Sequence, residues 1–229
     1  MASDEQMIKI VGDQFCVPYT MQLVVKRKVE SFSNVHYDVF DTTGNSLLQV
    51  DGGVWNSKKK RVIKDPAGFP VITLRKKALS WKKQWQIYQG ESSEKNHFLC
   101  SVQRSNALQM KNNLDVYLAS SYMEDGPDFH VTGSFTSMSF KVWKGNSVIA
   151  EVMHNFTWGS CMGKESFKLK VYPEVDYAFI LALTVIMHET DKLDCNATWN
   201  QQPATVEFSS SKATGSAALK LDRMQQLLD

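Results

Sequence analysis

Cys161 is the best candidate for a catalytic nucleophile, because it lies between two glycines in Gly159-Ser160-Cys161-Met162-Gly163. This glycine spacing matches a nucleophile elbow, a sharp turn that joins a strand to a following helix. The residues after Gly163 are typical of a strand instead, since Phe167, Leu169 and Val171 alternate with charged or polar residues. We therefore predict that Cys161 is not catalytic and that the protein is not an enzyme.

The remaining residues with metal-binding or nucleotide-binding chemistry are scattered. The five histidines form no HExxH pair, the four cysteines form no CxxC pair, and no P-loop or GxGxxG motif precedes a helix. This spacing predicts no metal, no cofactor and no disulfide framework, with the thiols reduced. These residues are His36, His97, His130, His154, His188, Cys16, Cys100, Cys161 and Cys195.

Basic residues are concentrated between Val54 and Trp85, where ten lysines and arginines face the single acid Asp65. The local balance is +9 on a chain whose formal net charge is only +2. Such an asymmetry predicts a surface for an anionic ligand, a phosphoinositide or an acidic membrane. The alternative is that these residues only solvate the edges and turns of a sheet. The predicted site residues are Lys58, Lys59, Lys60, Arg61, Arg75, Lys76, Lys77, Lys82 and Lys83.

Three aromatic residues, Trp81, Trp85 and Tyr88, lie among these lysines. Aromatic side chains in a basic groove can stack on the bases of single-stranded nucleic acid. A second hypothesis is therefore a nucleic-acid binder. The competing interpretation of the same three residues is that they pack in the wall of the fold.

The elements that position these residues are mostly short strands with one polar face. Leu114, Val116 and Leu118 alternate with polar neighbours, and turn sequences such as Asp41 to Asn45 and Pro66 to Gly68 separate β-like runs. We count roughly ten to twelve such strands along the chain. A closed antiparallel barrel hides the apolar face of every strand and removes the exposed edges, so we predict an all-β barrel.

One apolar run, Val175 to Met187, carries apolar residues on all sides, which is the pattern of a helix that is buried all round. It is far shorter than the roughly 18 to 20 apolar residues that span a bilayer. A barrel of about twelve strands is too wide for its own side chains to fill. We therefore predict a central helix over residues 174–189 inside the barrel.

Several stretches resemble the plant LURP-one-related family: YDVFDTTGNSLLQV, RVIKDPAGFPVITLRKK, WKKQWQIY and above all FKLKVYPEVDYAFILALTVIMHE. The resemblance covers about residues 15–190. It implies the tubby C-terminal-like fold, twelve strands around a hydrophobic helix, which the phospholipid scramblases share. It also implies a non-enzymatic binding module or adaptor that acts in plant defence, with a phosphoinositide as ligand. The same resemblance extends the second hypothesis to a membrane-tethered transcriptional regulator, as tubby-like proteins are described. Scrambling is not carried over, since the chain has no EF-hand pattern and no cysteine cluster.

The ends of the chain differ in composition from the barrel region. Residues 1–14 are polar, lack a secretory signal and are expected to form a loose tail. Residues 191–229 form a polar tail in which Leu219, Met224, Leu227 and Leu228 could share one face of a short helix that docks on the barrel, binds a partner or frays. We expect a monomeric cytoplasmic protein, at the plasma membrane under the first hypothesis or in the nucleus under the second.

Overall fold

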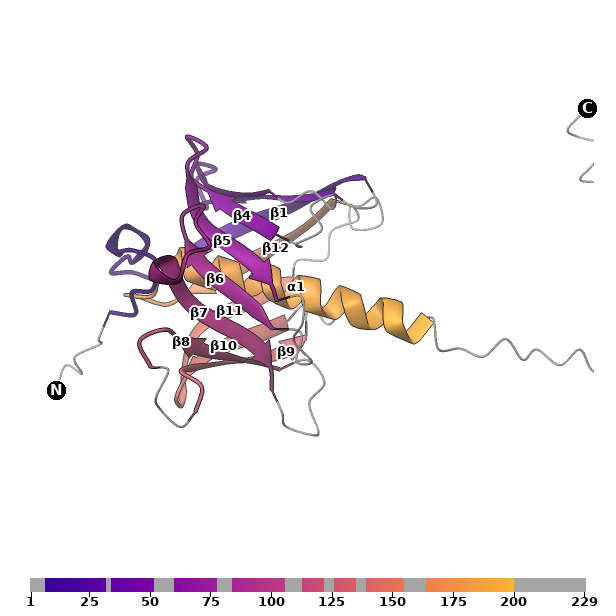
Figure 1. Ribbon diagram of the computed structural model, residues 1–229. Coiled ribbons are helices and arrows are strands. Elements are labelled where there is room, and N and C mark those ends of the chain that lie inside the picture. The colour runs from indigo at the N-terminus through magenta and orange to yellow at the C-terminus, as the bar shows by residue number, and fades with distance from the viewer. Residues whose placement is uncertain are drawn as a thin grey trace, which may run out of the picture. The chain divides into compact units, whose positions relative to one another are not determined.

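The computed structural model describes residues 7–31, 34–51, 60–77, 84–105, 113–121, 126–134, 139–154 and 164–199. Within these residues, twelve antiparallel strands close into a barrel around one helix (Figure 1). Each strand pairs with its neighbours in the sequence, and β1 pairs with β12 to complete the ring. This architecture confirms the predicted closed barrel with a central helix.

The strands are β1 (Met21–Ser31), β2 (Asn34–Phe40), β3 (Ser46–Asp51), β4 (Lys60–Lys64), β5 (Pro70–Lys76), β6 (Trp85–Gln89), β7 (Phe98–Arg104), β8 (Leu114–Leu118), β9 (Phe129–Ser134), β10 (Ser139–Lys144), β11 (Ser147–His154) and β12 (Lys164–Val171). Two short 3₁₀ helices, η1 (Asp13–Phe15) and η2 (Lys95–His97), lie in the connections. The single α-helix is α1 (Tyr177–Trp199).

Alternation along the strands sorts their side chains between the lumen and the outside. In β3, Leu48 and Val50 are fully buried while Leu47 and Gln49 are only half-buried, and the register pairs Val50 with Tyr37 of β2 and Ile63 of β4. Residues that are paired across neighbouring strands point to the same face of the sheet. The lumen is therefore lined by one continuous apolar surface.

Helix α1 fills this lumen (Figure 1). Every residue from Val175 to His188 is buried, and Phe179 packs against Phe129 of β9 with ring centroids 5.3 Å apart. The hydroxyl of Thr184 donates to the carbonyl of Ile180 at 2.9 Å, so this buried polar group is satisfied within the helix. The apolar circumference of the run thus packs against the barrel on all sides.

The helix begins at Tyr177, three residues later than predicted, and continues to Trp199, ten residues beyond the predicted end. Among the described residues no helix is long and apolar enough to cross a membrane. The predicted C-terminal tail, including Leu219 to Leu228, lies almost entirely outside the described residues.

An N-terminal strap, residues 7–20, lies against the start of α1. It corrects the prediction of a loose tail for residues 7–14, whereas residues 1–6 of that predicted tail lie outside the described residues. Asp176 is fully buried, and its carboxylate accepts hydrogen bonds from the backbone N–H groups of Ile10, Val11 and Gly12 at 3.2, 2.6 and 3.2 Å. It also caps α1 by accepting from the N–H of Phe179 at 3.0 Å. The carboxylate of Asp176 therefore holds the N-terminal strap against the first turn of α1.

The strand order defines two ends of the barrel. At the entry end, where α1 begins, lie the strap and the connections β2–β3, β4–β5, β6–β7, β8–β9 and β10–β11. At the exit end, odd-numbered strands finish and even-numbered strands start, and α1 leaves the barrel (Figure 1).

Candidate anion-binding surface

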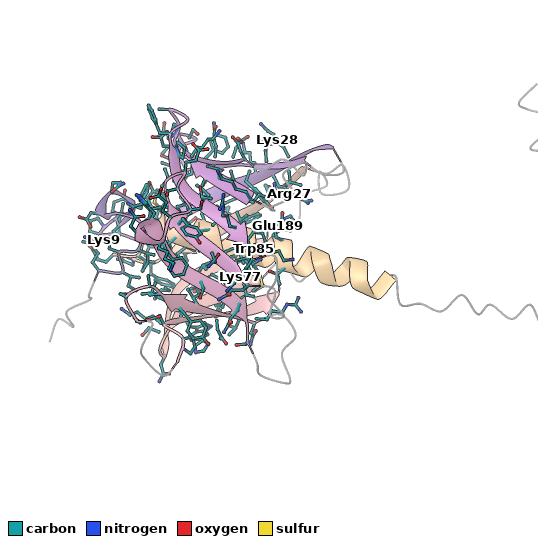
Figure 2. The ribbon with its side chains drawn as sticks, in the orientation of Figure 1. Lys9, Arg27, Lys28, Lys77, Trp85 and Glu189 are labelled. Carbon is teal, nitrogen blue, oxygen red and sulfur yellow. The ribbon has the colours of Figure 1, made fainter. Side chains whose placement is uncertain are left out.

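Cations gather at the exit end of the barrel. The register places the end of β1 beside the start of β12, the end of β5 beside the start of β4, and the end of β7 beside the start of β6. Basic segments that are distant in the sequence therefore lie at the same end of the barrel. Figure 2 shows Arg27, Lys28, Lys77 and Trp85 on this side of the barrel and Lys9 on the other. The cations at the exit end whose side chains are described are Lys26, Arg27, Lys28, Lys60, Arg61, Arg75, Lys76, Lys77 and Arg104, and the corresponding acids are Asp38, Asp51, Asp115 and Glu189.

Arg61 corrects the expectation that the whole predicted basic segment faces solvent. Strand alternation turns its side chain into the lumen, where it is 8% exposed. One guanidinium nitrogen donates to Glu189 of α1 at 2.7 Å and another to the carbonyl of Val35 at 3.2 Å. A buried arginine paired in this way fixes the helix to the barrel wall, and we assign it a structural role.

The other described residues of the predicted segment differ in how available their charges are. Lys60 is half-buried and forms an ion pair with Glu91 at 3.5 Å. Arg75 and Lys76 are half-buried at the end of β5, and Lys77 is exposed just beyond it. Of these, Lys77 is the cation best placed to meet a ligand from solvent.

Lys64 contributes to the local charge of +9 between Val54 and Trp85, but a neighbouring carboxylate neutralises it. It donates to Asp51 at 2.7 Å, and Asp51 also lies 3.0 Å from Nδ1 of His36. The hydrogen bond to Asp51 raises the pKa of Lys64.

Four predicted site residues, Lys58, Lys59, Lys82 and Lys83, lie outside the described residues, as do Trp81 and Cys161.

A second basic surface, the β1–β12 wall, was missed by sequence reasoning. It consists of Lys26, Lys28, Lys168 and Lys170, which alternate with the lumen-facing residues of β1 and β12. Lys28 forms an ion pair with Asp38 at 2.7 Å, whereas Lys26 lies 4.7 Å from the ring centroid of Phe40. The signal was present in the sequence, since each strand contains two lysines spaced two positions apart, but it required the knowledge that the first and last strands are neighbours.

The two described aromatic residues of the nucleic-acid hypothesis are buried. Trp85 is 3% exposed and Tyr88 is 8% exposed, and Tyr88 packs edge-on against Phe98 with centroids 5.6 Å apart. Stacking on bases needs an accessible ring face. Both residues therefore serve as barrel wall, which was the competing interpretation.

Among the described residues, no group of three histidine, cysteine or acidic side chains is arranged to hold a metal ion. Three of the histidines contact a nearby polar side chain. His36 contacts Asp51, His130 contacts Asp115 at 2.9 Å, and His188 of α1 bonds to the hydroxyl of the buried Tyr37.

We expect Cys16 and Cys100 to be unreactive at neutral pH. Burial, together with the nearby carboxylate of Asp176, raises the pKa of Cys16 to about 11, and complete burial raises the pKa of Cys100 as well. Because the thiolate is the reactive form, iodoacetamide at pH 7 should label both cysteines only slowly in the native protein and rapidly after denaturation. Peptide mass spectrometry measures the labelling of each cysteine.

Rapid native labelling of Cys161, with a hydrolase activity that Cys161→Ser abolishes, would contradict the non-enzymatic prediction.

Comparison with known proteins gives one consistent family. The LURP-one-related family model matches residues 21–188. Protein LURP-one-related 14 of Arabidopsis thaliana is 47% identical over 188 residues, covering 80% of this chain and 91% of that protein. Protein LURP-one-related 9 of the same plant is 42% identical, covering 82% of this chain and 100% of that protein. An X-ray structure of an Arabidopsis thaliana protein superposes with a TM-score of 0.61 at 32% identity, covering 79% of this chain and 97% of that one.

Proposed function

This chain belongs to the LURP-one-related family, and on that premise we propose that it is a non-enzymatic binding module that attaches to acidic membranes through the exit end and the β1–β12 wall. The observation that carries the proposal is the gathering of cations from β1 and β5 at the exit end, together with the lysines of the β1–β12 wall. The ligand is a phosphoinositide or another acidic headgroup. The site of action is the cytoplasmic face of a membrane, and the process that the family resemblance implies is plant defence.

The exposed lysines support a weak, reversible attachment. A lysine or arginine held near an anionic membrane contributes about 1 kcal/mol. Lys26, Lys28, Lys77 and Lys168 are exposed, and among them only Lys28 has an ion pair within the described part of the barrel. The other three contributions favour binding by roughly 3 kcal/mol, a weak attraction that permits exchange between membrane and cytoplasm.

The test is co-sedimentation with vesicles that contain phosphatidylinositol bisphosphate, compared with vesicles of phosphatidylcholine alone. We expect Lys26→Glu/Lys168→Glu to weaken binding to the acidic vesicles by about tenfold or more, because two favourable charges become repulsive. Lys77→Glu should weaken it less. The melting temperature should stay nearly unchanged, since all three side chains are exposed.

The matched control is Lys95→Glu/Lys144→Glu, which makes the same charge change with exposed lysines at the entry end. It should bind as the wild type does, and high salt should weaken every interaction. If the wild-type protein ignores acidic vesicles at low salt, the membrane proposal is wrong and a protein partner becomes the leading candidate. Tighter binding to single-stranded DNA than to vesicles would favour the nucleic-acid hypothesis.

A further inference from the structure

A cavity of about 550 Å³ lies at the entry end, remote in the fold from the cations of the exit end. The strap, the start of α1 and the tips of the β2–β3 and β4–β5 hairpins form its walls. Its apolar surface comes from Phe15, Leu47, Phe69, Val71 and Tyr177, and its polar groups include Asp65 and Gln89. Cavities of a few hundred Å³ with a mostly apolar lining and a few polar groups are the usual ligand sites of proteins.

The walls of this cavity are tied together before any ligand arrives. The amide of Gln89 donates to the carbonyl of Val11 in the strap at 3.3 Å, and the N–H of Gly90 donates to the carbonyl of Val71 at 2.8 Å. Phe15 packs edge-on against Tyr177 with ring centroids 5.4 Å apart. Because the parts are already in place, a ligand meets little ordering cost when it binds.

Phe69 is held at the rim of the cavity with 69% of its surface exposed. The turn that presents it is bonded at three points: Asp65 N–H to the carbonyl of Phe69 at 3.0 Å, Phe69 N–H to Oδ1 of Asp65 at 2.8 Å, and Gly68 N–H to the carbonyl of Asp65 at 3.0 Å. Gly68 adopts a φ of 90°, which favours glycine. An ordered turn thus presents a large aromatic ring to solvent beside an apolar cavity.

The loops around the cavity are acidic. Lys9 and Lys95 are the lysines of the described entry-end connections; Lys9 is already paired with Asp13 at 2.8 Å, and Glu91 is paired with Lys60 at 3.5 Å. A site with this charge favours a cation and disfavours the anions that suit the exit end. The described acids of these connections, apart from the buried Asp176, are Asp13, Asp41, Asp65, Glu91, Glu94, Asp128 and Glu174.

The form of the barrel limits how a polypeptide could bind here. All twelve strands of the described residues are paired on both sides, so this barrel offers no free strand edge for a peptide to extend the sheet. A peptide must instead be held by a side chain inserted into a cavity. We propose that the entry-end cavity binds a short segment of a partner protein that carries one bulky apolar side chain next to a lysine or arginine. The apolar side chain packs between Phe69, Leu47 and Val71, and the cation meets the carboxylate of Asp65.

This site is independent of membrane attachment, so the two proposals fail separately. The test begins with selection of a phage-displayed library of random twelve-residue peptides on the immobilised full chain. We expect enriched peptides to share a leucine, methionine, phenylalanine or tryptophan within two residues of a lysine or arginine. Fluorescence anisotropy with the labelled form of the most enriched peptide then gives its Kd.

Two variants and one control assign the binding to this cavity. Phe69→Ala should raise the Kd by about tenfold or more, as expected for loss of an aromatic anchor. Asp65→Asn keeps an acceptor for the N–H of Phe69 and removes the charge, so it should raise the Kd several-fold at low salt and little at high salt. Tyr19→Ala removes an aromatic ring that is 59% exposed outside the cavity lining and should leave the Kd unchanged.

The proposal is overturned if no peptide class is enriched, if the enriched peptides are acidic, or if their Kd is unaffected by both Phe69→Ala and Asp65→Asn. Circular dichroism and the melting temperature verify that each variant is folded. Both variants should still sediment with acidic vesicles as the wild type does, because neither residue belongs to the exit end or to the β1–β12 wall.

Discussion

Leu181→Asp should abolish cooperative unfolding and leave the protein insoluble or partly folded. Leu181 is fully buried in the middle of the α1 segment that fills the barrel lumen. An unpaired carboxylate at this position costs several kcal/mol or more, which is comparable with the roughly 5 to 15 kcal/mol that stabilise a typical domain. Circular dichroism during thermal unfolding and the yield of soluble protein measure the effect.

The control for this prediction is Leu181→Met, which nearly conserves the side-chain volume and should cost less than about 1.5 kcal/mol. It distinguishes burial of a charge from any change at this position. A soluble Leu181→Asp variant that melts cooperatively near the wild-type temperature would refute the assignment of α1 as the core of the barrel.

Asp176→Ala should lower the free energy of unfolding by about 3 kcal/mol or more and release the N-terminal strap. The change leaves four backbone N–H groups without their acceptor, three in the strap and one in the first turn of α1. A lost helix cap costs about 0.5 to 2 kcal/mol, and each buried unsatisfied donor adds about 1 to 3 kcal/mol unless water reaches it. Hydrogen exchange of residues 8–16 should accelerate, and the melting temperature should fall by roughly 6 to 12 °C.

Asp176→Asn is the informative companion variant. Burial raises the pKa of Asp176, even though the four N–H groups oppose this shift, so the carboxylate itself is costly to desolvate. The asparagine removes that charge and keeps an oxygen that can accept, and its loss of stability should therefore be clearly smaller than that of the alanine variant. Protected strap amides in Asp176→Ala would contradict the role that we assign to this contact.

The fold was predictable because its two main signals are local. Alternation of apolar and polar residues marks strands such as β3 and β8, and the uniformly apolar run from Tyr177 to Met187 marks a helix buried on all sides. A long apolar helix and many two-faced strands have few ways to bury their surfaces together, so the barrel with a central helix follows.

The candidate site was harder to predict because it depends on contacts between distant residues. Arg61 was grouped with its neighbours by charge, yet strand alternation turns it away from Lys60 and into the lumen. The β1–β12 wall joins lysines from the first and last strands, and the strap is bound by an aspartate that lies 165 residues from Val11. Composition alone contains none of these pairings.

The position of α1 in the chain has a consequence for biosynthesis. All twelve strands leave the ribosome before the helix that fills the lumen, and β1 must wait for β12 before the ring can close. Until then the nascent chain exposes the inner faces of its strands, and such surfaces aggregate or recruit chaperones. The barrel must therefore complete its fold after the last strand and the helix have emerged, and we expect folding to be slow, as it is for chains dominated by distant strand pairings.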